Sequence, residues 1–207
     1  MLDALHAADT ALFLFINATL AHPLLDPFFV TITNGRFWIA PGMALVALFF
    51  WKMDKKRAAL LVLLSVITVA ITDPLGAQII KPFFHRLRPC NPDALIEGGR
   101  FLLGHKTSLS FPSIHALNMF AQATLFSLLY PRLAVWLFLF AGLIGYSRIY
   151  VGVHYPFDVL GGAVIGVVCG AAVFYCYKIV AGVIKKTKVS IRIKPSPDRE
   201  GGEIENH

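Results

Sequence analysis

Three short stretches of the chain combine basic, histidine, serine and acidic residues in a way that suits chemistry on a phosphate group. They are residues 81–89, 111–115 and 147–158. Long apolar runs separate them along the sequence. If those runs cross a membrane in alternating directions, all three stretches reach the same membrane surface, where their side chains can form one site.

The basic side chains of these stretches can hold an anion. Lys81, Arg88 and Arg148 supply three positive charges. The planar guanidinium groups of the two arginines match pairs of phosphate oxygens. The sequence therefore predicts a phosphate site built from side chains, without a glycine-rich loop.

The second stretch predicts the start of a helix. Pro112 is expected at the first helical position, where its missing N–H is not needed. The backbone N–H groups near Ser113 and Ile114 would then face a bound anion, and the helix dipole would favour its negative charge. His115 follows directly and is available as a general acid for a leaving oxygen.

The third stretch pairs a histidine with an acid. His154 and Asp158 flank Pro156, which again indicates a helix start, and an acid is favoured in the first turn. Asp158 can take the proton of one imidazole nitrogen of His154. That contact fixes the tautomer and leaves the other nitrogen free to attack phosphorus.

The composition identifies the elements that must position these residues. Of the 207 residues, 57% are apolar and 15% are charged, and the mean hydropathy is +0.66. Globular domains average about 45–50% apolar and about 25% charged residues. Because the apolar residues collect in long, charge-poor runs, the sequence predicts an all-α, polytopic membrane helix bundle with about five to six transmembrane helices.

Five apolar runs are expected to be spans. They cover residues 37–51, 58–80, 112–130, 133–146 and 156–177. Residues 35–184 are therefore expected to form the transmembrane domain. Residues 1–34 predict an amphipathic segment in the membrane interface, or else a helical hairpin that dips into the membrane. Residues 185–207 predict a basic, disordered cytoplasmic tail.

The distribution of basic residues predicts the orientation. The cluster at residues 52–57 and the basic tail belong in the cytoplasm by the positive-inside rule, which puts the three polar stretches outside. The basic residues left on the outer side are Arg36, Lys81, Arg86, Arg88, Arg100, Lys106 and Arg148. Cations kept there against the usual bias suggest an anionic ligand. The net charge of +7 thus reflects membrane orientation and not nucleic-acid binding.

The three stretches together resemble the type 2 phosphatidic acid phosphatase (PAP2) superfamily of membrane lipid phosphatases. The family pattern is Lys-x6-Arg-Pro, then Pro-Ser-x-His, then Ser-Arg-x5-His-x3-Asp. The matching residues are Lys81, Arg88, Pro89, Pro112, Ser113, His115, Ser147, Arg148, His154 and Asp158. The motifs span residues 81–158, and the helix layout extends the likeness across roughly residues 10–180.

The resemblance implies a two-step reaction without a metal or other cofactor. His154, oriented by Asp158, would attack the phosphoryl group, and His115 would protonate the departing oxygen. The equatorial oxygens of the transition state would be held by Lys81, Arg88, Ser113, Ile114 and Arg148. Water would then hydrolyse the phosphohistidine.

One position departs from the family pattern, and three further residues are candidates for supporting roles. The residue between Ser113 and His115 is commonly glycine in the family and is Ile114 here, which can narrow the pocket or change substrate preference. The supporting candidates are Ser147, Asn118 and Asp73. Asn118 lies one turn beyond His115 and could orient it. Asp73 is an acid inside a predicted span, where it has either a functional role or a helix-packing hydrogen bond.

The remaining polar residues of the outer segment are expected to be solvated. These residues are Arg86, Arg100, Lys106, His85 and His105. For the three basic residues, recruitment of a lipid headgroup is the alternative.

The leading hypothesis is a phosphatase of the cell (inner) membrane that acts on a lipid phosphate or diphosphate from the outer, periplasmic side. Undecaprenyl diphosphate and phosphatidylglycerol phosphate are the substrates of the family members that this short chain resembles most, and phosphatidic acid and lipid A phosphate remain open. One alternative is a phosphotransferase that passes the phosphoryl group to a lipid hydroxyl. Another is a non-catalytic lipid transporter or binding protein, although transporters more often show internal repeats with broken helices.

Overall fold

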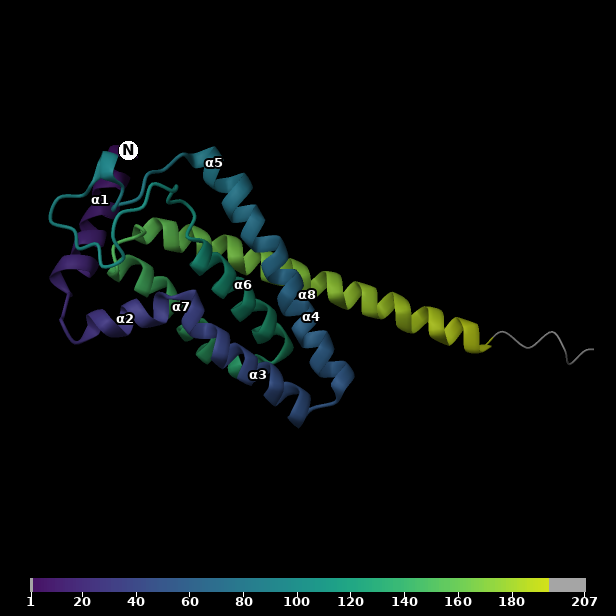
Figure 1. Cartoon of the computed structure of the whole chain (residues 1–207). Helices are drawn as coiled ribbons and strands as arrows, with labels where there is room; N and C mark the ends of the chain where they lie inside the picture. The colour runs from purple at the N-terminus through teal and green to yellow at the C-terminus, as the bar shows by residue number, and fades with distance from the viewer. Residues whose placement is uncertain (1, 194–207) are drawn as a thin grey trace, which may run out of the picture.

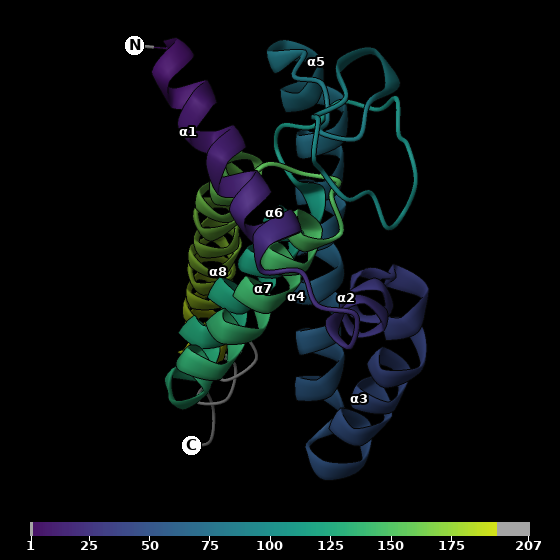
Figure 2. The same cartoon turned by 90° about the vertical axis from the view of Figure 1, so that its left-hand side faces the viewer.

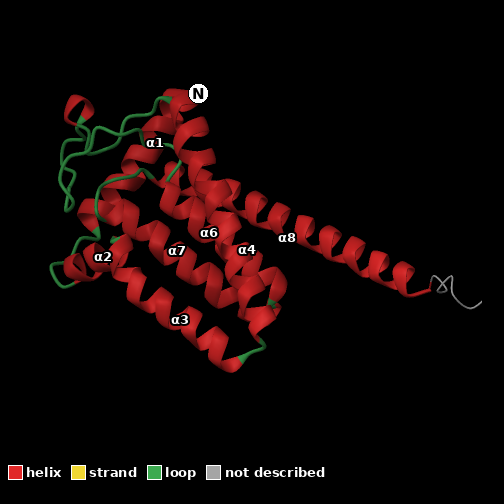
Figure 3. Cartoon of the chain, turned by 45° about the vertical axis from the view of Figure 1, so that its right-hand side comes forward, coloured by secondary structure: helices red, strands yellow, loops and turns green. Residues whose placement is uncertain are grey.

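The computed structural model describes residues 2–193, and for Leu2 and residues 186–193 it describes the backbone alone. The described chain consists of helices and loops, with no strand (Figures 1 and 3). The helices of the first half are α1 (Leu2–Leu14), continued by η1 (Phe15–Thr19), α2 (Leu25–Thr33), η2 (Gly35–Trp38), α3 (Ile39–Lys52) and α4 (Lys55–Pro74). The helix of α4 continues through η3 (Leu75–Ile80) and α5 (Lys81–Phe84). After η4 (Pro92–Ala94) follow α6 (Ile114–Leu129), η5 (Pro131–Leu133), α7 (Ala134–Tyr150) and α8 (Pro156–Ile193).

The apolar runs form helices as predicted, but among the described residues three or four of them qualify as membrane spans, fewer than the five to six that the composition predicts. Three described helices are long and apolar enough to cross a bilayer: Lys55–Phe84, Pro131–Tyr150 and Pro156–Lys185. A fourth crossing results if Leu25–Thr33 and Gly35–Lys52, which meet at a bend of 70°, act as one broken span. Helix α6 is apolar but shorter. The all-α, polytopic helix bundle is therefore confirmed.

Helices α6 and α8 form the central contact of the bundle through a row of glycines on α8. The glycines are Gly162, Gly166 and Gly170, spaced four residues apart. A Cβ added at Gly166 would lie 2.4 Å from the carbonyl oxygen of Leu117 on α6. Small residues at this spacing let two membrane helices approach closely. This contact fixes the start of α6 against the start of α8.

We expect Gly166→Ala to destabilise the protein, because the new methyl group has no space against the α6 backbone. Overpacking of this kind costs about 1–3 kcal/mol of unfolding free energy, measured by thermal or denaturant unfolding in detergent. Gly182→Ala is the matched control, since no atom lies within 4 Å of a Cβ at Gly182 on the same helix. Equal stability of the two variants would contradict the close packing of α6 on α8.

The N-terminal helix is tied to the rest of the bundle by one face. Asp9, Phe13 and Asn17, spaced four residues apart, are fully buried. Asn17 Nδ2 donates to the carbonyl oxygens of Arg100 and Tyr150, at 2.7 Å each. Figure 2 shows α1 running down to the ends of α7 and α8. The polar residues of this buried face thus bond to other parts of the protein. That the segment lies in the membrane interface stays a prediction.

The long loops between helices gather at one end of the bundle (Figure 3). The loop from α5 to α6 lies there, whereas the turn between α3 and α4, with its basic residues, lies at the opposite end (Figure 1). Asp54 caps α4 in that turn by accepting from the backbone N–H groups of Lys56 and Arg57. Helix α8 continues to Ile193, into the segment expected to be a disordered tail. Residues 194–207 of that tail lie outside the described residues.

Candidate active site

The structure brings the three chemical stretches together at the end of the bundle where the loops gather. Lys81 lies near the end of the α4–α5 helix, Ser113 is the N-cap of α6 and Arg148 is in the last turn of α7. The loop residue Arg88 donates to the carbonyl oxygen of Val153, just before α8, at 2.9 Å. All four polar side chains named here are buried. One site therefore contains residues from four separate elements.

The start of α8 fixes the acid of the histidine–acid pair. Asp158 Oδ2 accepts from the backbone N–H of Tyr155 at 2.9 Å, which is one half of a capping box. Ser110 Oγ donates to the same oxygen. His154 Nδ1 lies 3.4 Å from this carboxylate. Asp158 is thus held by contacts other than the histidine and can keep the ring in one orientation.

Arg88 occupies the other side of the imidazole. Its Nη1 lies 3.0 Å from His154 Nε2. Because an arginine can only donate, Nε2 accepts, and the neutral ring carries its proton on Nδ1, which faces Asp158. Burial, followed by the positive charge of Arg88, lowers the pKa of His154 well below its ordinary value of 6.5. The ring is therefore neutral, with its lone pair directed at the arginine.

This pKa predicts the acid limb of the pH profile. Protonation of His154 removes the lone pair, so the limb of kcat/KM that reports this group in the free enzyme should lie below pH 6.5. Arg88→Gln removes a positive charge, so it should raise the pKa of His154 and move the limb to higher pH. The measurement is kcat/KM against pH, corrected for ionisation of the substrate phosphate. A wild-type limb above pH 6.5 would contradict this prediction.

Two buried polar atoms of the site have no hydrogen-bond partner among the described residues. They are Ser113 Oγ and Arg148 Nε. Buried polar atoms are normally paired, so both atoms are available to a ligand. Arg148 Nη1 donates to Thr33 Oγ1 at 2.6 Å, and Lys81 Nζ donates to the carbonyl oxygen of Leu109 at 2.5 Å. These donors and cations lie together beside His154, and an anion site at this place stays a prediction.

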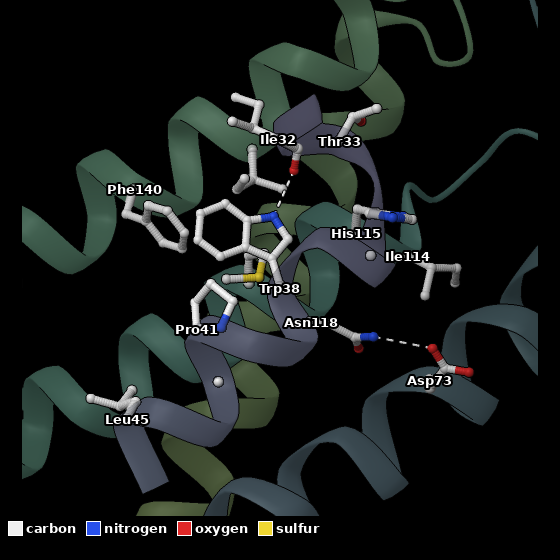
Figure 4. A pocket seen from close by; sticks show the side chains of 14 residues that line it. Ile32, Thr33, Trp38, Pro41, Leu45, Asp73, Ile114, His115, Asn118 and Phe140 are labelled. Atoms are coloured by element: carbon white, nitrogen blue, oxygen red, sulfur yellow. Dashed lines mark hydrogen bonds between the residues drawn. The ribbon is translucent and has the colours of Figure 1, made fainter. Parts of the chain in front are cut away.

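The second histidine joins this site to an apolar cavity. His115 lies in the first turn of α6 and lines a cavity of about 490 Å³. Figure 4 shows its side chain between those of Thr33 and Ile114 at one end of the labelled set. The cavity continues past Trp38 and Leu45 of η2 and α3. An apolar tail could thus lie beside a group that is bound at His115.

The comparisons with known proteins identify the family. The model of the PAP2 superfamily matches residues 58–180. The chain belongs to the PAP2 superfamily. The lipid A 4′-phosphatase of Porphyromonas gingivalis is 32% identical over 169 residues, 80% of this chain and 71% of that protein. An undecaprenyl-diphosphatase of Sulfolobus acidocaldarius is 34% identical over 136 residues, 62% of this chain and 58% of that protein.

A solved structure agrees with this assignment. The crystal structure of LpxE from Aquifex aeolicus has 34% sequence identity and a TM-score of 0.59, and the match covers 80% of this chain and 93% of that one. The chain is thus a multi-pass membrane protein and a PAP2-type lipid phosphatase, a phosphoric ester hydrolase.

The start of α6 in this PAP2 protein differs from the sequence prediction. The helix begins at Ile114, with Ser113 as its N-cap, so Pro112 precedes the helix and is not its first residue. The backbone N–H of Ser113 donates to the carbonyl oxygen of Asp158 at 3.0 Å. It is therefore used to join α6 to α8. The N–H groups of Ile114 and His115, in the first turn, have no acceptor within the helix.

Arg86 contacts the acid of the predicted PAP2 site. This position differs from the sequence prediction, which has Arg86 solvated in a loop. Its Nη1 donates to Asp158 Oδ1 at 2.9 Å, and its Nη2 donates to Asp9 Oδ2 at 2.5 Å. The guanidinium carbon lies 4.1 Å from the ring centre of Tyr155. The two carboxylates are fully buried and the arginine is 23% exposed. Burying two acids requires a cation between them, which explains the position.

The other polar residues between α5 and α6 differ in their contacts. Arg100 pairs with Asp26 of α2 while 31% of its side chain stays exposed, so it is only partly solvated. His105 Nδ1 lies 3.1 Å from the carbonyl oxygen of Cys90, although the residue is exposed. His85 is exposed at the end of α5, as expected.

The three supporting candidates all make hydrogen bonds, and that of Asp73 to Asn118 is the helix-packing bond that the sequence analysis gave as one alternative. Asn118 bonds to Thr72 and Asp73 and makes no hydrogen bond to His115 among the described residues, so its expected role in orienting that histidine is not supported. Ser147 Oγ donates to the carbonyl oxygen of Ile144 at 2.6 Å. It lies 3.2 Å from Thr33 Oγ1, the atom that holds Arg148.

Ile114 forms a wall of the apolar cavity. A Cβ at Gly76 would lie 2.4 Å from Ile114 Cδ1, so the isoleucine packs on the small residue of the α4 helix. Its side chain therefore narrows the space next to His115, while its backbone N–H stays at the helix start.

Proposed function

We propose that this PAP2 enzyme hydrolyses a lipid phosphate or diphosphate through a phosphohistidine on His154. The observation that carries this proposal is the neutral His154, with Nδ1 facing Asp158 and Nε2 facing the cation of Arg88. A phosphate placed at Arg88 would meet the lone pair of Nε2. Asp158 would stabilise the ring as positive charge develops on it.

The reaction proceeds in two balanced steps. The bound lipid phosphate brings a proton, which His115 takes up. Nε2 of His154 bonds to phosphorus as the P–O bond to the lipid breaks, and His115 gives this proton to the departing oxygen. A water molecule then loses a proton to His115, and its oxygen attacks phosphorus as the P–N bond breaks. Phosphate leaves with the proton of His115, and both histidines return to their starting states.

The cations and the unpartnered donors stabilise the transition state. Arg88, Arg148 and Lys81 neutralise the charge on the three equatorial oxygens, and Ser113 Oγ and Arg148 Nε are available to bind them. The N–H of Ile114 at the helix start adds a further donor. Preorganised donors of this kind act strongly where water is excluded, because they need no reorganisation during the reaction.

We propose that the site faces the outside of the cell (inner) membrane. The support is the position of the basic turn between α3 and α4 at the opposite end of the bundle. A variant with Cys90, Cys169 and Cys176 replaced and Glu97→Cys added tests this. An impermeant thiol reagent should label Glu97→Cys in intact cells and should not label Lys55→Cys. The reverse pattern would overturn the orientation.

The substrate candidates are lipids of the cell envelope. Undecaprenyl diphosphate and phosphatidylglycerol phosphate are expected from the family resemblance. The relatives named above act on lipid A or on undecaprenyl diphosphate, as their names state. These substrates share a phosphoryl group at the membrane surface and an apolar tail.

Phosphate release from the purified protein in detergent tests the function. We expect release from at least one lipid phosphate or diphosphate in the presence of EDTA. Adding a lipid alcohol in excess separates hydrolysis from transfer, since a phosphotransferase would form a phosphorylated lipid instead of free phosphate. No release from any validated lipid by folded protein would overturn the proposal. Binding without turnover would indicate a lipid-binding protein.

A further inference from the structure

A polar pair lies in the otherwise apolar cavity beside His115. The pair is Asp73 of α4 and Asn118 of α6, and most of the other lining residues are apolar. Asn118 Nδ2 donates to Asp73 Oδ1 at 3.1 Å. Figure 4 shows the two side chains pointing toward one another. The reaction steps above use neither residue.

A third residue fixes the direction of the amide. Thr72 Oγ1 lies 2.6 Å from Asn118 Oδ1, so the amide oxygen is occupied and the amide nitrogen is directed at Asp73. No described residue donates a hydrogen bond to the other carboxylate oxygen, Asp73 Oδ2. Asp73 is exposed on a helix that is apolar enough to span the membrane. An acid at such a position is costly and is retained when it has a function.

The distance from His115 determines which part of a substrate could reach this pair. Asn118 follows His115 by three residues on the same helix, so their Cβ atoms are about 5–6 Å apart. In the proposed reaction, His115 protonates the oxygen of the leaving group. The first atoms of the leaving group beyond that oxygen would therefore lie at Asn118 and Asp73, with the apolar tail farther along the cavity.

We propose that Asp73, held in place by Asn118, accepts a hydrogen bond from a hydroxyl or amide N–H next to the phosphoester. The preferred substrate is then a phosphate monoester of a sugar- or polyol-bearing lipid and not a lipid diphosphate. A diphosphate would place its second phosphate against the carboxylate, and like charges repel. This inference rests on the proposed function, because it takes the position of the leaving group from the role of His115.

A matched pair of substrates tests the inference. One is 1-oleoyl-glycerol 3-phosphate, and the other is 1-oleoyl-propanediol 3-phosphate, which lacks only the C2 hydroxyl. A hydrogen bond to a charged group contributes enough to predict a roughly tenfold to hundredfold higher kcat/KM for the hydroxyl-bearing lipid with the wild type. Asp73→Leu should abolish this ratio by lowering kcat/KM for that lipid alone. Gln78→Leu, a polar-to-leucine exchange on the same helix outside the cavity lining, should keep the ratio.

A second arm tests the charge. Asp73→Asn keeps an oxygen acceptor and removes the negative charge, so it should raise kcat/KM for farnesyl diphosphate by roughly tenfold. Asp73→Asn should lower the ratio of kcat/KM between the hydroxyl-bearing lipid and the lipid without the C2 hydroxyl less than Asp73→Leu does.

The outcomes separate this inference from the proposed function. A wild type with equal kcat/KM for the matched pair would overturn the inference while the phosphatase reaction stands. An equal loss on all substrates in Asp73→Leu would also overturn it, because it would indicate a purely structural role. Failure of the wild type to release phosphate from any lipid would overturn the proposed function itself.

Discussion

Replacing His154 with alanine is expected to lower the rate of phosphate release by at least about 10⁴-fold, because the side chain that is proposed to form the covalent intermediate is lost. The ring lies between Asp158 and Arg88, and no other described side chain occupies that position. Phosphate release from a lipid substrate, measured at substrate saturation, gives the effect on kcat.

Two further variants make this result interpretable. Asp158→Asn should lower kcat by up to about 10⁴-fold, because an amide cannot hold the Nδ1 proton in the same way as a carboxylate. His105→Ala removes a histidine from the loop between α5 and α6 and should leave kcat unchanged, since His105 bonds to the backbone carbonyl of Cys90 and not to a residue of the site. Near-normal phosphate release by folded His154→Ala would exclude the phosphohistidine.

The second large effect is expected at Arg86. Arg86→Leu leaves Asp9 and Asp158 buried without their shared cation. Removing one partner of a buried ion pair costs about 3–5 kcal/mol of unfolding free energy. The carboxylate of Asp158 would also lose one of the contacts that position it at His154, so kcat should fall by roughly 100-fold, as a small misplacement of a catalytic group can cause. Unfolding in detergent and phosphate release measure the two effects.

A double-mutant cycle separates charge from packing at this position. Asp9→Asn removes one of the two negative charges while the backbone N–H of Phe157 can still donate to the remaining oxygen. Combined with Arg86→Gln, it should recover part of the stability that Arg86→Gln alone loses. Additive losses in the double variant would show that Asp9 and Arg86 do not interact.

Much of the candidate site follows from residue types and spacing. The pattern places His154 and Asp158 around a helix start, and the structure has Pro156 as the first residue of α8 and Asp158 in its first turn. Local physics accounts for this, because a proline and an acid both favour the start of a helix. The apolar runs likewise determine α3, α4, α6, α7 and α8, since lipid requires backbone hydrogen bonds to be made within the segment.

The residues that sequence reasoning missed are joined across long separations. Arg86 meets Asp9 over a separation of 77 residues, and Arg148 meets Thr33 over 115. Nothing in helical periodicity marks Asp9 as the partner of a loop arginine. Its burial on α1, in register with Phe13 and Asn17, is the one local signal, since a buried face with two polar residues indicates specific partners.

The sequence by itself determined the class of this protein, its helices and the residues that are proposed to bind a phosphate, because apolar runs, helix caps and motif spacing are local properties. The tertiary structure alone decided which side chains hold those residues in place and which residues lie next to His115. The close contact of α6 with α8 brings His115 and His154 to one end of the bundle. The Asp73–Asn118 pair likewise exists only because α4 packs beside α6. Such contacts depend on the mutual packing of distant helices, which no short stretch of sequence encodes.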